Sequence, residues 1–463
     1  MKRLAVISFI VFTGCKGRGG NVIREIGIGL HNNNELKIQV DVATNADASV
    51  YAEYWQDSVA GKLFTSAVSE RGFHHALVLG NIVPKTDYSF RLVTESGGDR
   101  NVSKTYTFRS RALPMWLQDQ FKYSCTRPEL LPGVFKDGFL LMNKREAPGF
   151  MYIVDTKGQL RWYHMVDGTG VKVTHFTKDT TIISILGKSD EPTSYGSEIL
   201  EINLLGDTLL HLKKGQGDLK YTIHHEVIKN SAGNVVTIYE EPRIMDLSRI
   251  GGGKTDTVNG DGILVLDKQG KKVWQWSVFD VCDPFSDSDL KKHKSDWMHA
   301  NSLSYDKDSN YLMSFYNLGQ VWKVDAHSGK VLWKLGKGGT VGLPASGTFS
   351  QSHAVHINPY GSLMLFDNGV GRGLSGVYAF NIQPDGRAAT VDWHFNLPAE
   401  IYNDRMGSAY MVNDSLVLCC CSKRHITVLA DKKGMLLWTL DTAIPPYRVQ
   451  FIPAAMVKPF IIN

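Results

Sequence analysis

Residues 263–276 read ILVLDKQGKKVWQW. An apolar run ends at Asp267, a turn follows at Gly270, and a second run ends at Trp276. Apolar runs of this length on either side of a glycine turn are typical of a β-hairpin. The pattern occurs six times after residue 138, with a tryptophan in five of the second runs and turn glycines at Gly158, Gly206, Gly270, Gly329, Gly386 and Gly434.

The spacing of these hairpins indicates the architecture. Successive turn glycines are about 48 to 64 residues apart, which is enough for four short strands and their connections. In a β-propeller the first strand of each such unit lines the central channel, and the last strand lies toward the outside. The sequence therefore predicts an all-β chain with a six-bladed β-propeller over residues 113–463, in which the tryptophans pack between blades.

Residues 34–112 follow a different pattern. Short stretches with alternating apolar residues, such as 36–42 and 50–55, have the spacing of a small β-sandwich. The segment VPKTDYSFRL, residues 83–92, resembles the fibronectin type III signature, in which the tyrosine makes a corner hydrogen bond. We predict an N-terminal β-sandwich with an accessory packing role.

The N-terminus resembles a bacterial lipoprotein signal. A basic start is followed by an apolar run over residues 4–12 and by small residues that end at Cys15. The run is too short to span a bilayer, which needs about 20 residues. The resemblance implies lipidation at Cys15 and a periplasmic or outer-membrane lipoprotein of a Gram-negative bacterium; a plain secretory signal is the alternative. Residues 16–33, rich in Gly and Asn, are predicted to form a flexible tether.

Charge and cysteine content exclude some functions. The formal net charge is +5 over 463 residues, and the basic residues are scattered, which does not suggest a nucleic-acid partner. Five cysteines follow Cys15, namely Cys125, Cys282 and Cys419–Cys421, so an oxidising compartment leaves at least one unpaired. No cysteine or histidine pair has zinc spacing. We interpret the run of three as strand residues, some of them buried.

Three histidines precede turns in consecutive copies of the repeat. His225 and His353 each lie eight positions before a turn glycine, and His299 opens a looser copy. Inner strands of adjacent blades converge at one mouth of the channel, so we expect three equivalent imidazoles around one pocket. Core packing gives no reason for a titratable ring in three consecutive blades, whereas an anion site does.

In order, the motifs HHE at 224–226, HAN at 299–301, and His353 followed by FDNG at 366–369 resemble the bacterial aryl sulfotransferase (arylsulfate sulfotransferase) family. The resemblance covers nearly the whole mature chain. It implies transfer of a sulfuryl group from a phenolic sulfate ester to another phenol through a sulfohistidine, with no cofactor and no required metal. The implied partners are an aryl sulfate donor, a phenolic acceptor and the membrane through the lipid anchor. Oligomeric state stays open, with a homodimer as one option.

Carried over by position, His353 is the nucleophile, and His225, His299 and Asn301 contact the sulfate and the bridging oxygen. A neutral imidazole can attack sulfur and divide the transfer into two steps. A second histidine can give the leaving oxygen a proton and later recover one, a contribution of about 10²–10⁴-fold. Asn301 can donate hydrogen bonds to the other sulfate oxygens. His224 is a further substrate contact, although strand alternation points it away from His225.

The chain departs from the family at Tyr316, where an arginine usually balances the sulfate charge. Three explanations stay open: Arg372 reaches the site, Tyr316 donates a hydrogen bond to the substrate, or the substrate or turnover has changed. The last motivates an alternative, a propeller that binds a sulfated or aromatic ligand without turnover. A quinone-dependent dehydrogenase would need calcium-binding acidic residues that the sequence does not supply, and a plain scaffold would leave the histidines unexplained.

Overall fold

The computed structural model describes residues 22–457. They form two compact units, one built from the N-terminal residues to Gln120 with Leu160–His164, the other from Phe121–Gln159 and Met165–Met456. The signal, Cys15 and the start of the tether lie outside the described residues, so export and lipidation stay predictions. Within the described residues, no helix is long and apolar enough to cross a membrane.

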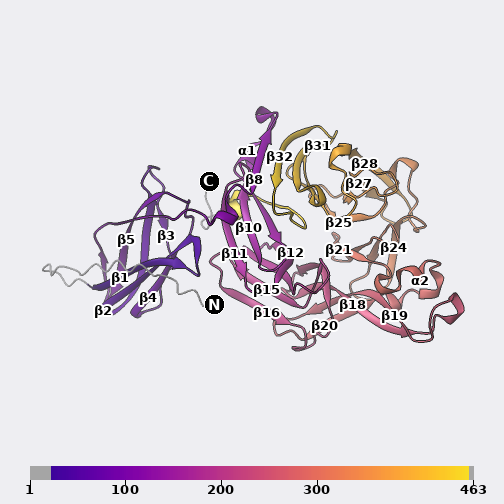
Figure 1. Ribbon diagram of the computed structural model, residues 1–463, viewed down its shortest axis with the longest axis horizontal. Helices are drawn as coiled ribbons and strands as arrows, with labels where there is room; N and C mark the ends of the chain where they lie inside the picture. Colours follow the sequence, from indigo (N-terminus) through magenta and orange to yellow (C-terminus); the bar gives the residue numbers. More distant parts are fainter. Residues whose placement is uncertain (1–21, 458–463) are drawn as a thin grey trace. The chain divides into compact units, whose positions relative to one another are not determined.

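The N-terminal unit is built from seven strands (Figure 1). They are β1 (Ile23–His31), β2 (Asn34–Gln56), β3 (Phe64–Thr65), β4 (Gly72–Leu79), β5 (Asp87–Ser96), β6 (Asp99–Val102) and β7 (Tyr106–Arg109). The first half of β2 pairs with β1 and β4, and its second half with β3 and β5. Both halves contribute to one apolar core, which includes Val40, Val50 and Phe90. Burial of these alternating residues is the main stabilising term.

The structure confirms the tyrosine corner and corrects the tether. The hydroxyl of Tyr88 accepts from the Val83 amide at 2.9 Å and donates to the Asn81 carbonyl at 3.2 Å. Residues 23–31, predicted as part of the flexible tether, instead form β1, which pairs with β2 along most of its length. Ile26 is buried in the core and Leu30 packs against it. Sheet pairing and this burial outweigh the local glycine content.

The second unit is a six-bladed β-propeller, as predicted (Figure 1). From the inner strand outward, blade 1 has β33 (Gln450–Ile452), β9 (Phe139–Lys144), β10 (Gly149–Asp155) and β11 (Leu160–Val166), and blade 2 has β12 (Gly170–Phe176), β13 (Thr181–Gly187), β15 (Glu198–Asn203) and β16 (Thr208–Lys213). Blade 3 has β17 (Ile223–Lys229), β18 (Val235–Met245), β19 (Asp256–Leu266) and β20 (Lys272–Ser277), with β14 (Tyr195–Gly196) beside β17. Blade 4 has β21 (Ala300–Tyr305), β22 (Tyr311–Phe315), β23 (Gln320–Val324) and β24 (Val331–Gly336), and blade 5 has β25 (Ser352–Ile357), β26 (Leu363–Asp367), β27 (Gly376–Ile382) and β28 (Ala389–Asn396). Blade 6 has β29 (Ser408–Met411), β30 (Leu416–Cys421), β31 (Ile426–Asp431), β32 (Leu436–Thr442) and β8 (Phe121–Cys125).

Both ends of the propeller segment close the ring. β8 pairs with β32 on the outer edge of blade 6, and β33 pairs with β9 on the inner side of blade 1. Two single-turn helices, α1 (Gly133–Lys136) and α2 (Leu290–His293), lie in connections, and α3 (Ala454–Val457) follows β33. Two closures satisfy strand edges that would otherwise be free to pair with other chains.

The tryptophans of the repeat link neighbouring blades. The indole of Trp276 in blade 3 donates to the carbonyl of Gly329, in the blade 4 turn, at 2.8 Å. Trp438 in blade 6 donates to the carbonyl of Thr156, in the blade 1 turn, at the same distance of 2.8 Å. Buried indoles usually find such a partner. The predicted packing role between blades is confirmed for these two side chains.

Replacing Gly386 by alanine is expected to lower the free energy of unfolding by about 1–3 kcal/mol, because the new side chain would adopt a left-handed backbone and its Cβ would clash with Trp333. The φ angle of Gly386 is +70°, and an added Cβ would lie 2.8 Å from Cδ1 of Trp333. The control is Gly361→Ala, at a φ of +95° with nothing within 4 Å of the new Cβ. Chemical denaturation should show the larger loss for Gly386→Ala, and equal losses would contradict the proposed clash.

The cysteine run lies in β30, and its three side chains are buried. Cys419 and Cys421 belong to the apolar core between blades 5 and 6. All five cysteines of the described residues are free. The interpretation of this run as buried strand residues is confirmed, and burial raises the pKa of each of the three thiols.

Candidate functional site

The inner strands of blades 3, 4 and 5 depart from regular pairing at the same end. The ladders of β17, β21 and β25 are interrupted between His224 and Val227, between Ala300 and Ser302, and between His353 and His356. The φ angles of His225, His299 and Ala354 are 59°, 55° and 51°. Left-handed backbone is uncommon for residues other than glycine and often marks functional sites.

These irregularities correct the predicted equivalence of the three histidines. His353 pairs with Phe366, but the interruption in β17 is larger, so that His224 rather than His225 pairs with Ile238. His299 lies one residue before β21 begins. The rings therefore reach the channel from three different backbone positions. The tertiary bulges, which the sequence repeat did not reveal, decide where each ring lies.

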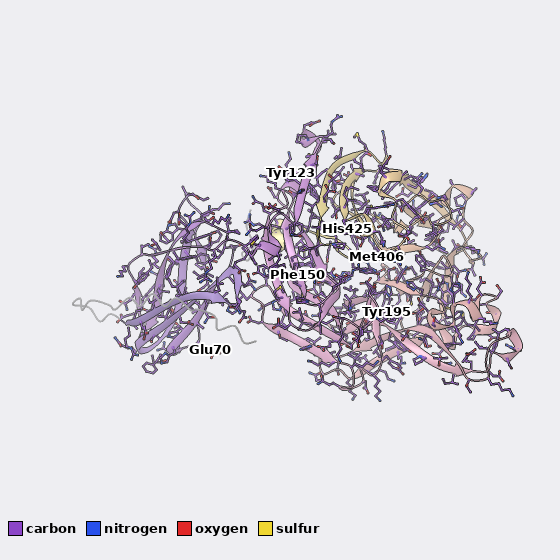
Figure 2. The ribbon with its side chains drawn as sticks, viewed as in Figure 1. Glu70, Tyr123, Phe150, Tyr195, Met406 and His425 are labelled. Carbon is purple, nitrogen blue, oxygen red and sulfur yellow. The ribbon has the colours of Figure 1, made fainter. Side chains whose placement is uncertain are left out.

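The three histidines nevertheless line one cavity of about 620 Å³. Ring centroids are 4.9 Å apart for His225 and His299, 5.3 Å for His299 and Tyr316, and 5.6 Å for Tyr316 and His353. Tyr195, Met406 and His425, labelled in Figure 2, also line this cavity. The predicted convergence of His225, His299 and His353 on one pocket is present in the structure.

Asn368 determines which nitrogen of His353 carries the hydrogen. The amide nitrogen of Asn368 donates to the carbonyls of Asn403 and Met406 at 2.7 and 2.9 Å. Its Oδ1 therefore faces Nδ1 of His353, at 2.6 Å. A carbonyl oxygen only accepts hydrogen bonds, so Nδ1 carries the hydrogen and Nε2 holds the lone pair.

His353 is neutral in this environment. Burial lowers the pKa of the imidazole to about 3, and the positive charges of Arg448 and His299 act in the same direction. Nε2 lies 3.2 Å from the amide nitrogen of Asn301, which also donates to the Ser352 carbonyl at 2.9 Å. An uncharged imidazole with an unprotonated Nε2 is the form that can act as a nucleophile. Asn301 is buried beside it and does not line the cavity, and its contact with the sulfate stays a prediction.

His299 is in the opposite electrostatic state. Burial disfavours its charge, but the hydrogen bond to Asp296 and the charges of Asp296 and Asp261 outweigh burial and raise the pKa of the imidazole. Nδ1 of His299 lies 2.5 Å from Oδ2 of Asp296. Nδ1 donates to this carboxylate, so a second hydrogen on Nε2 is available to a ligand. The cavity thus pairs a neutral histidine with one that is readily protonated.

His225 is backed by His224. The two Nδ1 atoms are 2.8 Å apart, and Nε2 of His224 lies 3.3 Å from Oδ1 of Asp261, within ion-pair range but outside hydrogen-bond geometry. Burial lowers the pKa of His225 far below its usual value, and the neighbouring histidines add to this shift. His224 is fully buried and does not line the cavity. Its predicted substrate contact is therefore wrong, because the bulge places it behind His225.

Two further predicted contacts need correction. The hydroxyl of Tyr316 donates to the Asp404 carbonyl at 2.9 Å, so its ring rather than its hydroxyl faces the histidines. Arg372 forms an ion pair with Asp367 and donates to the Thr348 carbonyl at 3.0 Å, and it does not line the cavity. Asp367 and Thr348 hold this guanidinium away from the site. Arg372 therefore does not replace the missing arginine.

Sequence reasoning missed the cations of the site. Arg145, Arg405 and Lys423 line the cavity, and Asp296, which His299 engages, is the one carboxylate among the described lining residues. They come from blade 1 and blade 6 connections, outside the histidine repeats. From the sequence, scattered Lys and Arg residues were interpreted as solvated surface. No local sequence signal distinguishes these three cations from the other basic residues. Residues 22–457 contain no group of three or more His, Cys, Asp or Glu side chains able to hold a metal ion.

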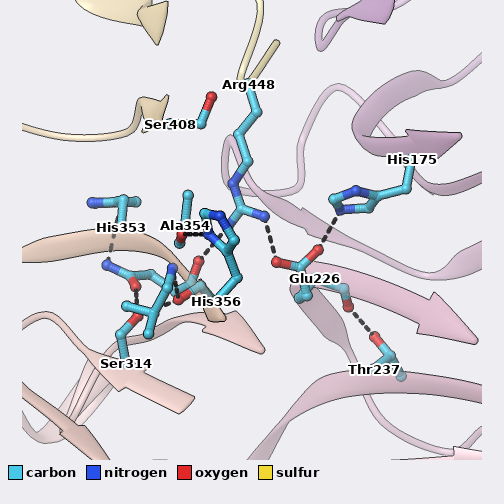
Figure 3. A network of polar contacts seen from close by, with 12 residues as sticks. His175, Glu226, Thr237, Ser314, His353, Ala354, His356, Ser408 and Arg448 are labelled. Atoms are coloured by element: carbon cyan, nitrogen blue, oxygen red, sulfur yellow. Dashed lines mark hydrogen bonds and ion pairs between the residues drawn. The ribbon is translucent and has the colours of Figure 1, made fainter. Parts of the chain in front are cut away.

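A buried ion pair joins Arg448 and Glu226 near the site (Figure 3). Arg448 Nη1 contacts Glu226, which also contacts Nε2 of His175, and Arg448 Nη2 donates to the Asn301 carbonyl at 2.7 Å. Burial alone would raise the pKa of Glu226, but Arg448 and His175 lower it to about 2. The pair connects the closing segment to blades 3 and 4 and fixes the backbone at Asn301.

A model of the arylsulfotransferase (ASST) family matches residues 129–422, more than half of the chain. No curated protein sequence matches. Among solved structures, a protein of unknown function from Bacteroides caccae has a TM-score of 0.45 and 11% identity, over 68% of this chain and 99% of that one. A catalytically inactive virginiamycin B lyase from Staphylococcus aureus, solved with quinupristin, has a TM-score of 0.32 and 10% identity, over 69% and 99%.

Proposed function

Because the chain belongs to the arylsulfotransferase family, we propose that it moves a sulfuryl group from a phenolic sulfate ester to another phenol through a sulfohistidine at His353. One observation carries the proposal: a neutral imidazole with an unprotonated Nε2, which Asn301 contacts at 3.2 Å, lies in a cavity with three cationic side chains and one engaged carboxylate. Such a cavity favours an anionic substrate whose central atom accepts a nucleophile.

In the first half-reaction Nε2 of His353 attacks the sulfur of the donor. The N–S bond forms, the bond between sulfur and the aryl oxygen breaks, and the phenoxide leaves with the electron pair. His299 gives its Nε2 proton to that oxygen. Asn301 releases Nε2 and donates to a sulfate oxygen instead. By analogy with phosphoryl transfer, charge develops chiefly on the leaving oxygen, where a positioned acid contributes about 10²–10⁴-fold.

The second half-reaction reverses these steps with a new phenol. The acceptor oxygen attacks sulfur, the N–S bond breaks, and the imidazole of His353 recovers its lone pair. His299, now neutral, takes the phenol proton and returns to its starting state. His225, neutral in this environment, lies next to His299 at 4.9 Å between ring centroids and lines the same cavity. The aromatic wall of Tyr195 and Tyr316 suits a phenolic ring.

The proposal is tested with 4-nitrophenyl sulfate, with and without added phenol, by following nitrophenolate and the intact protein mass. We expect acceptor-dependent release and, without acceptor, a sulfuryl adduct on the protein. A panel of aryl sulfates follows if this donor is inert. Saturable binding of the panel without release or adduct would instead support the alternative, a propeller that binds sulfated or aromatic ligands without turnover.

The rate of the first half-reaction should fall as the pH rises through the pKa of His299, because the acid then lacks its proton. Phenyl sulfate is the suitable donor, since its leaving phenoxide has a pKa near ~10 and needs protonation. In Asp296→Asn the carboxylate that raises the pKa of His299 is lost, so the fall should move to lower pH. Rapid-quench measurement of phenol release without acceptor checks this shift.

The matched control for this shift is Asp385→Asn, at an exposed carboxylate in the blade 5 turn. It should leave the pH profile unchanged. Identical profiles for Asp296→Asn and the wild type would show that His299 is not the acid.

A further inference from the structure

Arg145 is a buried cation that forms no ion pair with any of the described residues. The residue is 7% exposed. Its Nη1 contacts the sulfur of Met406 at 2.9 Å, and its buried Nε has no hydrogen-bond partner. Among residues 22–457, no carboxylate lies within ion-pair distance of it. An unpaired buried charge is costly, and burial lowers the pKa of this guanidinium. A side chain kept in this state is ready for an anion from outside.

The backbone at Arg145 is held in place by close packing. The residue follows β9 and immediately precedes the turn to β10. A Cβ on Gly170 would lie 1.8 Å from the carbonyl oxygen of Arg145, so only glycine permits this approach. Because the backbone is held, little backbone entropy is lost there when a ligand binds.

Met406 connects Arg145 to the nucleophile. Its sulfur accepts from Arg145, and its carbonyl accepts from Asn368 at 2.9 Å. Asn368 in turn contacts Nδ1 of His353 at 2.6 Å. Arg145 and His353 also line the same cavity. The guanidinium is therefore on the wall of the space in which the reacting group must lie.

From this placement we infer that Arg145 is the residue that binds the sulfate group of the donor. The inference rests on the proposed function for the identity of the anion. Arg145, in blade 1, would supply the positive charge that Tyr316 cannot supply. Arg405 and Lys423 are both exposed and would attract the anion to the entrance of the cavity. A planar guanidinium matches two sulfate oxygens at once, as it does those of phosphate.

The test uses inorganic sulfate as the probe, titrated calorimetrically into full-length protein. Arg145→Met keeps the volume and removes the charge, and it should weaken sulfate binding by roughly 10- to 100-fold, the range for hydrogen bonds to charged groups. Arg145→Lys keeps the charge but lacks the planar guanidinium, so its sulfate affinity should lie between those of the wild type and Arg145→Met. Arg387→Met, at a side chain that is 87% exposed in the blade 5 turn, should match the wild type.

Equal sulfate affinity of wild type and Arg145→Met, including no measurable binding by either, would overturn the inference. If Arg145→Met does not fold, Arg145→Lys is used in its place. An unchanged sulfate affinity of Arg145→Lys would then also overturn the inference. Sulfate binding needs no turnover, so the two proposals can fail separately. Loss of binding in Arg145→Met with no sulfuryl transfer by the wild type would reject the proposed function alone. Transfer with an unchanged KM for the donor in Arg145→Met would reject the role of Arg145 alone.

Discussion

Replacing His353 by alanine is expected to reduce aryl sulfate turnover by on the order of 10⁴–10⁶-fold, as when other enzymes lose a covalent nucleophile. The methyl group cannot form the N–S bond, so the intact mass should show no sulfuryl adduct with donor alone. The fold should survive, because the ring is held by polar contacts with Asn301 and Asn368 and is not part of an apolar core. Steady-state release and intact mass together check this result.

The matched control is His394→Ala, in the same blade on the outer strand β28 and exposed. It should keep full activity. A His353→Ala protein with activity within tenfold of the wild type, or with an adduct of the wild-type mass, would remove His353 as the nucleophile. His299→Ala should instead retain the adduct and lose about 10²–10⁴-fold in rate, the contribution of a positioned acid. The two variants thus separate covalent catalysis from proton transfer.

Replacing Arg448 by methionine is expected to lower the free energy of unfolding by about 3–5 kcal/mol, because breaking a buried ion pair leaves an uncompensated charge. Arg448 is 6% exposed and Glu226 is 3% exposed. The variant also loses the hydrogen bond to the Asn301 carbonyl, which joins the closing segment to blade 4. Figure 3 shows Glu226 between Arg448 and His175, both of which contact its carboxylate. Urea denaturation measures the loss.

The double variant Glu226→Gln with Arg448→Met should be less destabilised than Arg448→Met alone, because the neutral amide removes the unpaired charge. The surface control is Arg387→Met, whose ion pair with Asp385 is exposed and contributes little. A loss for Arg448→Met no larger than that of this control would show that the buried pair does not stabilise the ring.

Acid should also weaken this pair in a defined direction. The folded-state pKa of Glu226, about 2, is below the value of ~4.3 for an unperturbed glutamate. A carboxyl whose pKa is depressed on folding contributes stability that is complete above its unfolded pKa and is lost as the pH falls through its folded pKa. The contribution of Glu226 should therefore disappear between about pH 5 and pH 2.

Much of the architecture follows from local sequence. The predicted hairpins from Gly158 to Gly386 correspond to the two outer strands of blades 1 to 5, and the hairpin at Gly434 forms β31 and β32, which β8 follows on the outer edge of blade 6. The apolar alternation and turn glycine of each hairpin are read within about fifteen residues. The tyrosine corner at Tyr88 is equally local, since both of its partners lie within seven residues. Patterns of this kind depend on steric and burial preferences that neighbouring residues express together.

Contacts between residues that are distant in the sequence could not be predicted from such local patterns. β1 became a strand because β2 and the sandwich core were available to it. Nothing in the run of residues 121–125 indicates that it completes a blade whose other strands begin at Ser408. These pairings depend on backbone groups that meet only after folding. The composition of residues 23–31 therefore predicted a flexible tether, whereas the structure has a strand.

By itself, the sequence determined the six repeats, the sandwich, and the three histidines that converge on one cavity. Only the tertiary structure decided the protonation of each ring, because Asn368, Asp296 and Arg448 act on them through burial and charge. It also decided which arginine lines the cavity. Arg372 is close in sequence to the predicted site but is held by Asp367, whereas Arg145 comes from blade 1 and faces the cavity unpaired. The physical reason is that bulges and ion pairs direct side chains across blades, and neither produces a periodic pattern in the sequence.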